Sequence, residues 1–372
     1  DSYFDILIDK DQEFSISNNT ENLSENFICK GSSDNELLAE YQLFALKIRK
    51  KIREIEESKP IIGEEKTFIK SDSLNLIIRE KRKEMIAQNP TTFFSVLLLA
   101  MSEPDVPDAI LQISESASFQ YYKQHYFDNI SFSDPRLLRS PIVFNKINHF
   151  FNYLCEWHPD TVVKYALQLC EKSQTNPEFF QFVFNHLFSS FEKSGKLTHD
   201  EAFVVLAEKY CLTGKTPWFS PEAIPMIKER ITQVKPTLTG QPAPNIELSD
   251  SSGKSIDLKK PLGTWTVLFF WDPECEHCRD LYYKLSVLAN DPEMSQLKII
   301  SIYTGKNNTL WKNFIADKST PFVHTIITPG KEKLVEKWDL YMTPRIFVLD
   351  NKLRIAFKDP DPENLKEMLF GM

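Results

Sequence analysis

The stretch Phe269-Phe270-Trp271-Asp272-Pro273-Glu274-Cys275-Glu276-His277-Cys278-Arg279 places two cysteines two residues apart. The preceding run, Thr264–Trp271, is aromatic and β-branched and predicts a buried strand. The following run, Arg279–Leu285, predicts a helix. Cys275 is therefore expected at a strand-to-helix turn, where free backbone N–H groups and the helix dipole favour an anion. An anionic thiolate is the form of cysteine that attacks disulfides, so the placement suits redox chemistry.

The cysteine pair has two other possible interpretations, a zinc site and an inert structural disulfide. Zinc sites use the same spacing, but they need a second pair of ligands, and the next candidate ligand after Cys278 is only His324. We therefore expect no metal. An inert structural disulfide is the second alternative, and a short loop on a helix end is an unusual place for one.

Composition limits the class of protein. The chain has 372 residues, of which 42% are hydrophobic, enough for two or three domains with their own cores. The net charge of −8 argues against nucleic acid as a main partner. The longest apolar segment, Phe93–Met101, is too short to span a bilayer. Because the sequence starts at Asp1 without a signal peptide, we interpret it as a processed or trimmed form whose compartment cannot be read from its start.

The first part of the chain predicts a small β segment, residues 1–33. Three short strands are expected there, at Tyr3–Asp9, Glu13–Ile16 and Phe27–Cys29. Three such strands make a poor independent domain, so we interpret them as the end of a truncated β-domain or as packing on the helices that follow.

Residues 34–235 predict an α-helical domain. Asp34 is the expected N-cap of its first long helix, and Ser73–Gln88 is expected to be the second. A basic run in the first helix is interpreted as a solvated face, with contact to anionic lipid as the alternative; it comprises Lys47, Arg49, Lys50, Lys51 and Arg53. The many aromatic residues predict core packing, with a groove for a client peptide as the alternative. A Pro-rich and Gly-containing boundary follows at Gln233–Pro244.

From residue 239 the pattern changes to alternating strands and helices. Strands are expected at Asn245–Ser249, Ser255–Leu258, Thr264–Trp271, Leu297–Tyr303, Phe322–Ile327, Thr343–Asp350 and Leu353–Phe357, and helices at Leu310–Ala316, Gly330–Trp338 and Pro362–Phe370. This order resembles the thioredoxin fold, and specifically the TlpA/ResA-like thiol-disulfide oxidoreductases, over residues 239–372. The resemblance rests on Gly240-Gln241-Pro242-Ala243-Pro244, Ser252-Gly253-Lys254, Phe270-Trp271, Cys275-Glu276-His277-Cys278 and Met342-Thr343-Pro344.

The resulting fold class is an α/β thioredoxin-like C-terminal domain preceded by a mostly α-helical domain and a short N-terminal β segment. The resemblance implies that Cys275 is the attacking thiol and Cys278 the resolving thiol. It also implies that Pro344 is a cis-proline facing the pair, with Thr343 offering backbone groups to an extended client chain. Trp271, Glu276 and His277 would be supporting residues. No cofactor is implied.

Two departures from the family pattern leave the proton acceptor for Cys278 open. Thioredoxins carry a buried Asp six residues before the first cysteine, and here that position is Phe269. Many TlpA-like proteins carry a Glu three residues after the second cysteine, and here Leu281 stands there, beside Asp280. Glu276, Asp280 and water are all candidates.

The leading hypothesis is a thiol-disulfide oxidoreductase, acting as a reductase on client proteins in the periplasm or cell envelope. The resemblance implies a membrane electron-donor protein as a partner. The alternative is an interaction protein whose helical domain binds a partner and whose thioredoxin-like module is a non-catalytic scaffold. A peroxidase is a third possibility. It is disfavoured because peroxidase chemistry requires a Thr three residues before the reactive cysteine, and here that residue is Asp272.

Overall fold

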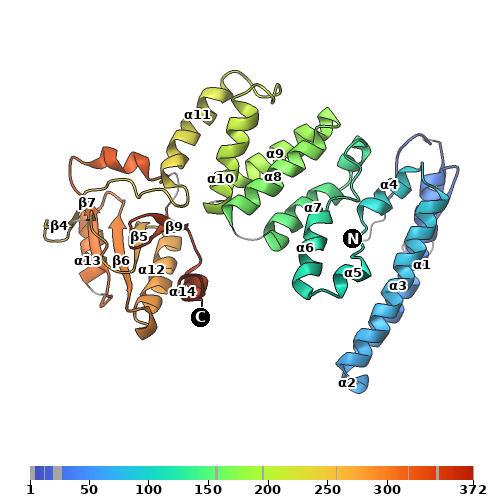
Figure 1. Cartoon of the computed structure of the whole chain (residues 1–372), viewed down its shortest axis with the longest axis horizontal. Coiled ribbons are helices and arrows are strands. Elements are labelled where there is room, and N and C mark those ends of the chain that lie inside the picture. Colours follow the sequence, from blue (N-terminus) through green and yellow to red (C-terminus); the bar gives the residue numbers. More distant parts are fainter. Residues whose placement is uncertain are drawn as a thin grey trace. The chain divides into compact units, whose positions relative to one another are not determined.

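A computed structural model describes residues 5–11, 13–19, 27–155, 158–194, 197–256, 258–316, 318–340 and 343–371. The chain divides into two compact units (Figure 1). The first comprises Asp1–Leu154 with Ser173–Phe179, and the second comprises Cys155–Lys172 with Phe180–Met372. In the described ranges no helix is both long and apolar enough to cross a membrane.

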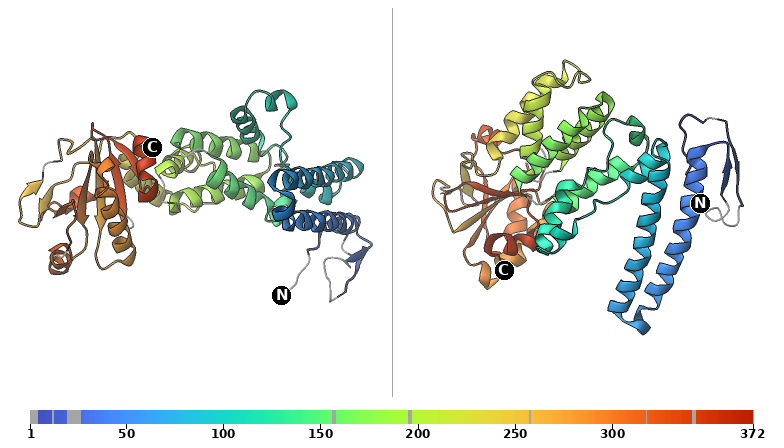
Figure 2. Two further views of the ribbon diagram at one scale, coloured as in Figure 1. Left: turned by 90° about the horizontal axis from the view of Figure 1, so that it is seen from below. Right: turned by 45° about the vertical axis from the view of Figure 1, so that its right-hand side comes forward.

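The first unit is mainly helical. Two short strands, β1 (Ser15–Ser17) and β2 (Ile28–Lys30), pair antiparallel ahead of the helices. The helices are α1 (Ser33–Glu57), α2 (Lys59–Ile62), α3 (Glu64–Gln88), α4 (Phe93–Ala100), α5 (Asp108–Leu111), α6 (Glu115–His125) and α7 (Ile142–His149), with a 3-10 helix at Pro135–Arg139 and a π-helical turn at Phe150–Leu154. Helices α1 and α3 lie side by side and are joined at one end by α2 (Figures 1 and 2).

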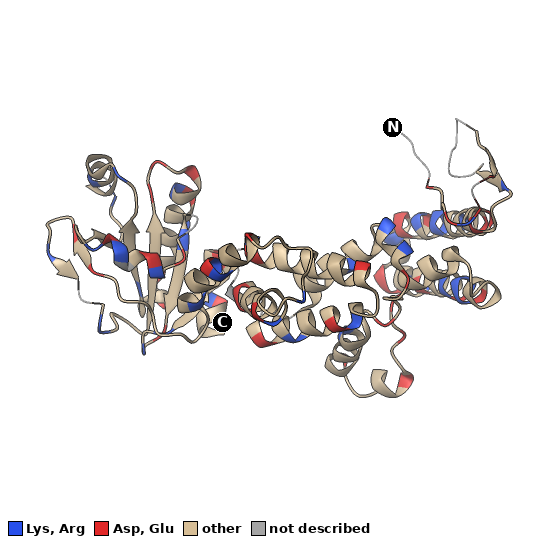
Figure 3. Ribbon diagram, turned by 90° about the horizontal axis from the view of Figure 1, so that it is seen from above, with Lys and Arg blue, Asp and Glu red and all other residues tan. Residues whose placement is uncertain are grey.

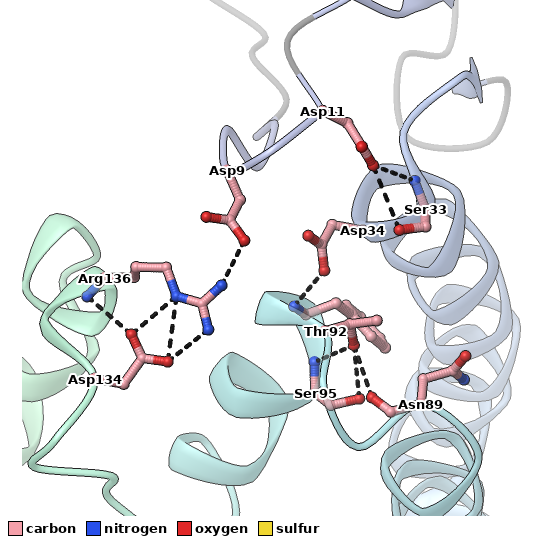
Figure 4. A network of polar contacts seen from close by, with 10 residues as sticks. Asp9, Asp11, Ser33, Asp34, Asn89, Thr92, Ser95, Asp134 and Arg136 are labelled. Atoms are coloured by element: carbon pink, nitrogen blue, oxygen red, sulfur yellow. Dashed lines mark hydrogen bonds and ion pairs between the residues drawn. The ribbon is translucent and has the colours of Figure 1, made fainter.

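Residues 5–9 form no strand, so the expected strand at Tyr3–Asp9 is wrong in its described part; Tyr3 and Phe4 lie outside the described residues. The backbone N–H of Leu7 donates to the side-chain oxygen of Asn35, and the side-chain nitrogen of Asn35 donates back to the Leu7 carbonyl, both at 2.7 Å. Nearby, Asp9 forms an ion pair with Arg136 (Figure 4). The N–H and carbonyl groups of Leu7 are thus hydrogen-bonded to a side chain instead of to a neighbouring strand.

The N-cap of α1 is Ser32 and not Asp34, because the Ser32 hydroxyl accepts from the N–H of Asn35. Asp34 instead accepts a hydrogen bond of 2.7 Å from the N–H of Phe94, in the first turn of α4 (Figure 4). A carboxylate there satisfies a free N–H and complements the helix dipole. Asp34, expected to cap α1, therefore binds the start of a different helix, at a residue 60 positions further along the chain.

The second long helix, α3, begins nine residues before the expected Ser73 and ends at Gln88 as expected. Gly63, with φ +84°, separates α3 from α2, and Glu64 and Glu65 occupy the first turn, where the helix dipole favours them. The five basic residues of the run in α1 are exposed. Basic and acidic residues both lie along α1 and α3 (Figure 3), which agrees with a solvated face.

The second unit combines helices with a seven-stranded sheet. The helices that precede the sheet are α8 (Pro159–Ser173), α9 (Pro177–Lys193), α10 (Leu197–Leu206) and α11 (Ala223–Val234), with a π-helical turn at Ala207–Cys211 and a 3-10 helix at Lys235–Thr237. The strands are β3 (Leu248–Asp250), β4 (Ser255–Ile256), β5 (Trp265–Trp271), β6 (Leu297–Tyr303), β7 (Val323–Ile327), β8 (Arg345–Leu349) and β9 (Ile355–Lys358). The helices around the sheet are α12 (Glu276–Ala289), α13 (Asn308–Ala316) and α14 (Pro362–Phe370), with 3-10 helices at Pro292–Met294 and Glu332–Lys337.

The strand order is β4-β3-β7-β6-β5-β8-β9. Strand β5 lies parallel to β6 and antiparallel to β8, so the strand that leads into the cysteines is central. Its side chains alternate between two cores. Val267, Phe269 and Trp271 pack with Cys278 and Tyr282 of α12, whereas Leu268 and Phe270 pack on the opposite face with Trp338. Both faces are buried, as expected for a strand in the middle of an α/β sheet.

Two expectations in this unit need correction. Residues 330–338 contain a 3-10 helix at Glu332–Lys337 instead of an α-helix. The first hairpin strand begins at Leu248 and not at Asn245, because pairing with β7 starts only at Leu248. Ile246 lies before this pairing and packs in the same core cluster as Trp338. Asp257, expected in the second hairpin strand, lies outside the described residues.

Candidate functional site

The two cysteines lie at the turn between β5 and α12. Cys275 is the N-cap residue of α12, with extended backbone angles of φ −87° and ψ 125° and no side-chain cap. Its N–H donates to the carbonyl of Asp272 at 3.1 Å, which closes the turn. No side chain caps the first turn of α12. The backbone N–H groups there and the positive end of the helix dipole therefore favour a negative charge at the Cys275 sulfur.

The two thiols differ in accessibility. Cys275 is partly exposed, whereas Cys278, one turn later, has no exposed surface. Burial, aided by the hydrogen bond to Cys275, raises the pKa of Cys278 to about 12, although a backbone hydrogen bond at Asp272 lowers it in part. Both thiols are free. An accessible thiol beside a buried, protonated one is the arrangement that attack followed by resolution needs.

The residues between and beside the cysteines reach a surface pocket. Glu276 and His277 are exposed. His277 lines a pocket of about 380 Å³ together with Pro344, and the Thr343–Pro344 peptide bond is cis. The remaining residues of this pocket are Asp280, Leu281, Lys284, Ile346, Asp359, Pro360, Asp361 and Pro362. Thr343 is partly buried, and Met342 lies outside the described residues.

Trp271 lies beneath the site and not at its surface. Its side chain is fully buried, and its indole N–H donates a hydrogen bond of 2.7 Å to the Ser301 hydroxyl. Its ring packs 4.9 Å from that of Tyr282 in α12, measured between centroids. Trp271 therefore supports the turn from below, through contacts to both the sheet and the helix.

A carboxylate that sequence reasoning passed over acts electrostatically on the buried cysteine. Asp272 is partly buried, and its charge acts on Cys278, whose pKa it raises in addition to burial and to Cys275. Asp272 Oδ1 accepts from the N–H of Glu274 at 2.9 Å. Its Oδ2 lies over Gly305, where a Cβ atom would meet it at 2.2 Å. By contrast, the expected candidates Glu276 and Asp280 are exposed.

Asp272 could have been found from the sequence, because it is the only acidic residue between the strand and the first cysteine besides Glu274. No sequence signal pointed to Gly305, where the absence of a Cβ atom leaves space for the carboxylate. Phe269, at the position where thioredoxins carry Asp, lies in the core with no exposed surface.

The other four cysteines lie away from this turn. All four are buried, namely Cys29, Cys155, Cys170 and Cys211. Burial raises the pKa of Cys170 to about 12 and that of Cys211 to about 11, so both are unreactive thiols at neutral pH. Within the described ranges, no three His, Cys, Asp or Glu side chains gather as a metal site would require.

Residues 239–358 match the model of the AhpC/TSA family. The C-terminal region is a thioredoxin-like domain. Residues 73–235 match a domain of unknown function, DUF5106. The two matches together cover most of the chain and meet at the Pro-containing segment after α11.

Curated relatives of the thioredoxin-like domain are thiol-disulfide oxidoreductases. The protein named ResA from Bacillus subtilis is 22% identical over 117 residues, which are 32% of this chain and 64% of that protein. ResA from Bacillus cereus is 25% identical over 130 residues, 35% of this chain and 73% of that protein. The chain thus spans about two thirds of the relatives' length, and the match takes in about one third of this chain.

A solved thioredoxin-like protein from Bacteroides caccae has the same fold over a larger part of the chain. Its structure aligns with a TM-score of 0.59 at 16% sequence identity and covers 72% of this chain and 97% of that one. This coverage extends well beyond residues 239–372. The fold of a helical region followed by a thioredoxin-like domain is therefore shared with that protein.

Proposed function

We propose that the protein is a thiol-disulfide oxidoreductase that reduces disulfides of client proteins through Cys275 and Cys278. One observation carries the proposal: Cys275 is accessible at the start of α12, while Cys278 beside it is buried and protonated. The ResA relatives support the class of reaction.

The proposed reaction has two exchange steps. The Cys275 thiolate attacks one sulfur of a client disulfide; the client S–S bond breaks, and its other sulfur leaves as a thiolate. Cys278 then attacks the Cys275 sulfur of this mixed disulfide, which releases the second client thiolate and leaves Cys275 and Cys278 joined. The client has gained two electrons, and a dithiol reductant restores the pair.

Resolution requires Cys278 to lose its proton. With a pKa of about 12, the buried thiol does not ionise unaided near neutral pH. We assign the acceptor role to Asp272, because its residue is partly buried and its charge acts on Cys278, whereas Glu276 and Asp280 face solvent. The carboxylate, which accepts a hydrogen bond from the Glu274 N–H, can take the proton directly or through a water molecule.

Pro344, Thr343 and His277 belong to the client side of the proposed site. The pocket that His277 and Pro344 share is next to the start of α12 and open to solvent. We propose that a client chain binds there, with Thr343 pairing to its backbone. We also propose that the reaction takes place in the cell envelope and that a membrane electron-donor protein supplies the reductant; both statements rest on the ResA-like resemblance alone.

Insulin reduction tests the proposal. The wild-type protein with a dithiol reductant is expected to precipitate the insulin B chain well above the rate of the reductant alone. Cys275→Ser should abolish the increase. Cys29→Ser replaces another buried cysteine far along the chain from the pair and serves as the matched control, with no loss expected. A wild type that adds nothing to the reductant's rate overturns the assignment and favours the scaffold alternative.

A further inference from the structure

Six charged side chains, four of them buried and two partly buried, form a cluster between the helices and the sheet of the second unit. We call it the charge cluster. It comprises Asp200 of α10, Arg230 of α11, Asp339 after the last 3-10 helix, Arg345 of β8, Lys358 of β9 and Asp359 beyond it. Three acidic and three basic groups balance, so no net charge is buried.

Lys358 and Asp339 are at the centre of the charge cluster. Lys358 Nζ lies 2.6 Å from Asp339 Oδ2 and also contacts the Asp200 carboxylate; both Lys358 and Asp339 side chains have no exposed surface. Arg230 contacts Asp339 through two guanidinium nitrogens, the second at 3.3 Å. Burial disfavours the ionised form of Asp339, but the hydrogen bonds from Arg230 and Lys358 outweigh it and lower its pKa to about 2.

The charge cluster extends to the strand that follows the cis-proline. Asp339 lies 3.8 Å from the guanidinium of Arg345, the residue directly after Pro344. Arg345 in turn forms an ion pair with Asp359. Asp359 and Pro344 both line the pocket beside His277. Charged groups of the helical region are therefore connected, contact by contact, to two residues of the pocket wall.

The turn at Asp359 depends on these contacts. Its φ of +46° is in the left-handed region, which non-glycine residues seldom adopt. Asp359 Oδ1 accepts from the N–H of Ile346 at 2.7 Å, and its own N–H donates to the Ile346 carbonyl at 2.8 Å. A conformation of this kind persists only where the surroundings hold it in place, and here the holding groups are Arg345 and β8.

Buried ion pairs add little net stability compared with apolar packing, because desolvation offsets their attraction. Their directional contacts do fix the geometry of the groups that they join. We propose that Asp200 and Arg230 are positioning residues that set the shape of the pocket beside Pro344. Both belong to the region that matches DUF5106, so the inference gives that region a task in client binding; it rests on the proposed function.

Loss of these contacts should affect reduction of a peptide disulfide but not the reaction of Cys275 with a small reagent. Asp200 and Arg230 touch neither cysteine in any contact described above, so the reaction of Cys275 with a small reagent should not depend on them. A disulfide-bonded peptide must also fit the pocket. Loss of the positioning contacts should therefore raise KM for the peptide and leave the small-reagent rate unchanged.

The test uses the full chain with Asp200→Asn, which keeps the shape of the side chain but removes its charge. KM and kcat for reduction of a disulfide-bonded peptide are measured beside the rate of Cys275 alkylation by iodoacetamide. We expect KM to rise about threefold or more with the alkylation rate unchanged. Glu208→Gln is the matched control, because Glu208 forms an exposed ion pair with Lys235 at 2.5 Å in the same region. It should change neither quantity.

Removing one charge from a buried cluster can prevent folding, so the same measurements are made on Arg230→Lys. Lysine keeps the positive charge but not the two-nitrogen contact with Asp339. A folded Asp200→Asn or Arg230→Lys variant with wild-type KM overturns the inference. A variant whose alkylation rate falls by the same factor as its kcat/KM for the peptide also overturns it. If the wild type itself does not reduce the peptide, the proposed function fails first, which is a distinct result.

Discussion

The indole nitrogen of Trp271 lies 2.7 Å from the hydroxyl oxygen of Ser301, where β5 and β6 run side by side beneath the cysteine turn. Ser301 has no exposed surface, and His324 Nδ1 lies 3.2 Å from the same hydroxyl. One serine thus satisfies polar groups of two neighbouring strands under the site.

Ser301→Ala should destabilise the fold. The change leaves the buried N–H of Trp271 without a partner, and an unsatisfied buried donor costs about 1–3 kcal/mol. Urea unfolding followed by tryptophan fluorescence measures the difference. Ser295→Ala, at an exposed serine, should stay within about 0.5 kcal/mol of the wild type. Equal effects of the two substitutions would contradict the role given to Ser301.

His324 should make stability depend on pH. Burial lowers its pKa from 6.5 to about 4, so between these values the unfolded chain binds a proton that the folded chain does not. Stability therefore falls as pH drops from about 6.5 to about 4. The shift corresponds to at most about 3 kcal/mol, and partial exposure of the ring reduces the effect to about 1–2 kcal/mol.

Other groups titrate in the same range, so the wild type is compared with His324→Asn. The variant should lose less stability between pH 6.5 and 4.5 than the wild type loses. If the free energy of unfolding changes with pH equally in the two proteins, His324 is not the cause of the pH dependence.

The two site cysteines should react at different rates with iodoacetamide. Near neutral pH the reduced folded protein should be modified first at Cys275, because Cys278 is buried and its pKa is about 12. Mass spectrometry of peptides after brief treatment measures each site. In urea both should react at similar rates. Preferential modification of Cys278 in the folded state would contradict the assigned order of attack.

Asp272→Asn should slow resolution and leave attack unchanged. Asparagine keeps the hydrogen bond from the Glu274 N–H but cannot take a proton from Cys278. General-base groups contribute about 10²–10⁴-fold, and water can substitute in part, so we expect a loss of about tenfold or more in the rate at which the mixed disulfide is released. Stopped-flow mixing with a disulfide-bonded reporter peptide separates the two steps.

The controls for Asp272 are the two exposed carboxylates that the sequence also offered. Glu276→Gln and Asp280→Asn should resolve the mixed disulfide at nearly the wild-type rate. If either slows resolution more than Asp272→Asn does, the proton acceptor has been assigned to the wrong carboxylate.

Local sequence signals predicted the centre of the C-terminal domain well. The strand at Leu297–Tyr303 and the helix at Pro362–Phe370 have the expected bounds, and β5 starts one residue later than expected. These elements are specified by mostly apolar runs or by a proline at the helix start, which depend on neighbours in sequence alone. The position of Cys275 at a helix start followed from the same signals.

The sequence could not predict features whose partners are distant in the chain. Asp34 looked like a cap for its own helix, yet it binds the N–H of Phe94. Asp200 and Lys358 are 158 residues apart, and neither stands out in a chain with many charges. Asp272 lies against Gly305, which is 33 residues further along the chain. In each case the contact is decided by tertiary packing, which overrides local preference.

Trapping of the mixed disulfide tests the central claim most directly. Reduced Cys278→Ala protein, mixed with a disulfide-bonded client such as insulin, is run on a non-reducing gel beside Cys275→Ala protein. We predict a covalent adduct with Cys278→Ala that disappears on reduction, and none with Cys275→Ala. Absence of an adduct from Cys278→Ala, or equal adducts from the two variants, would contradict the account.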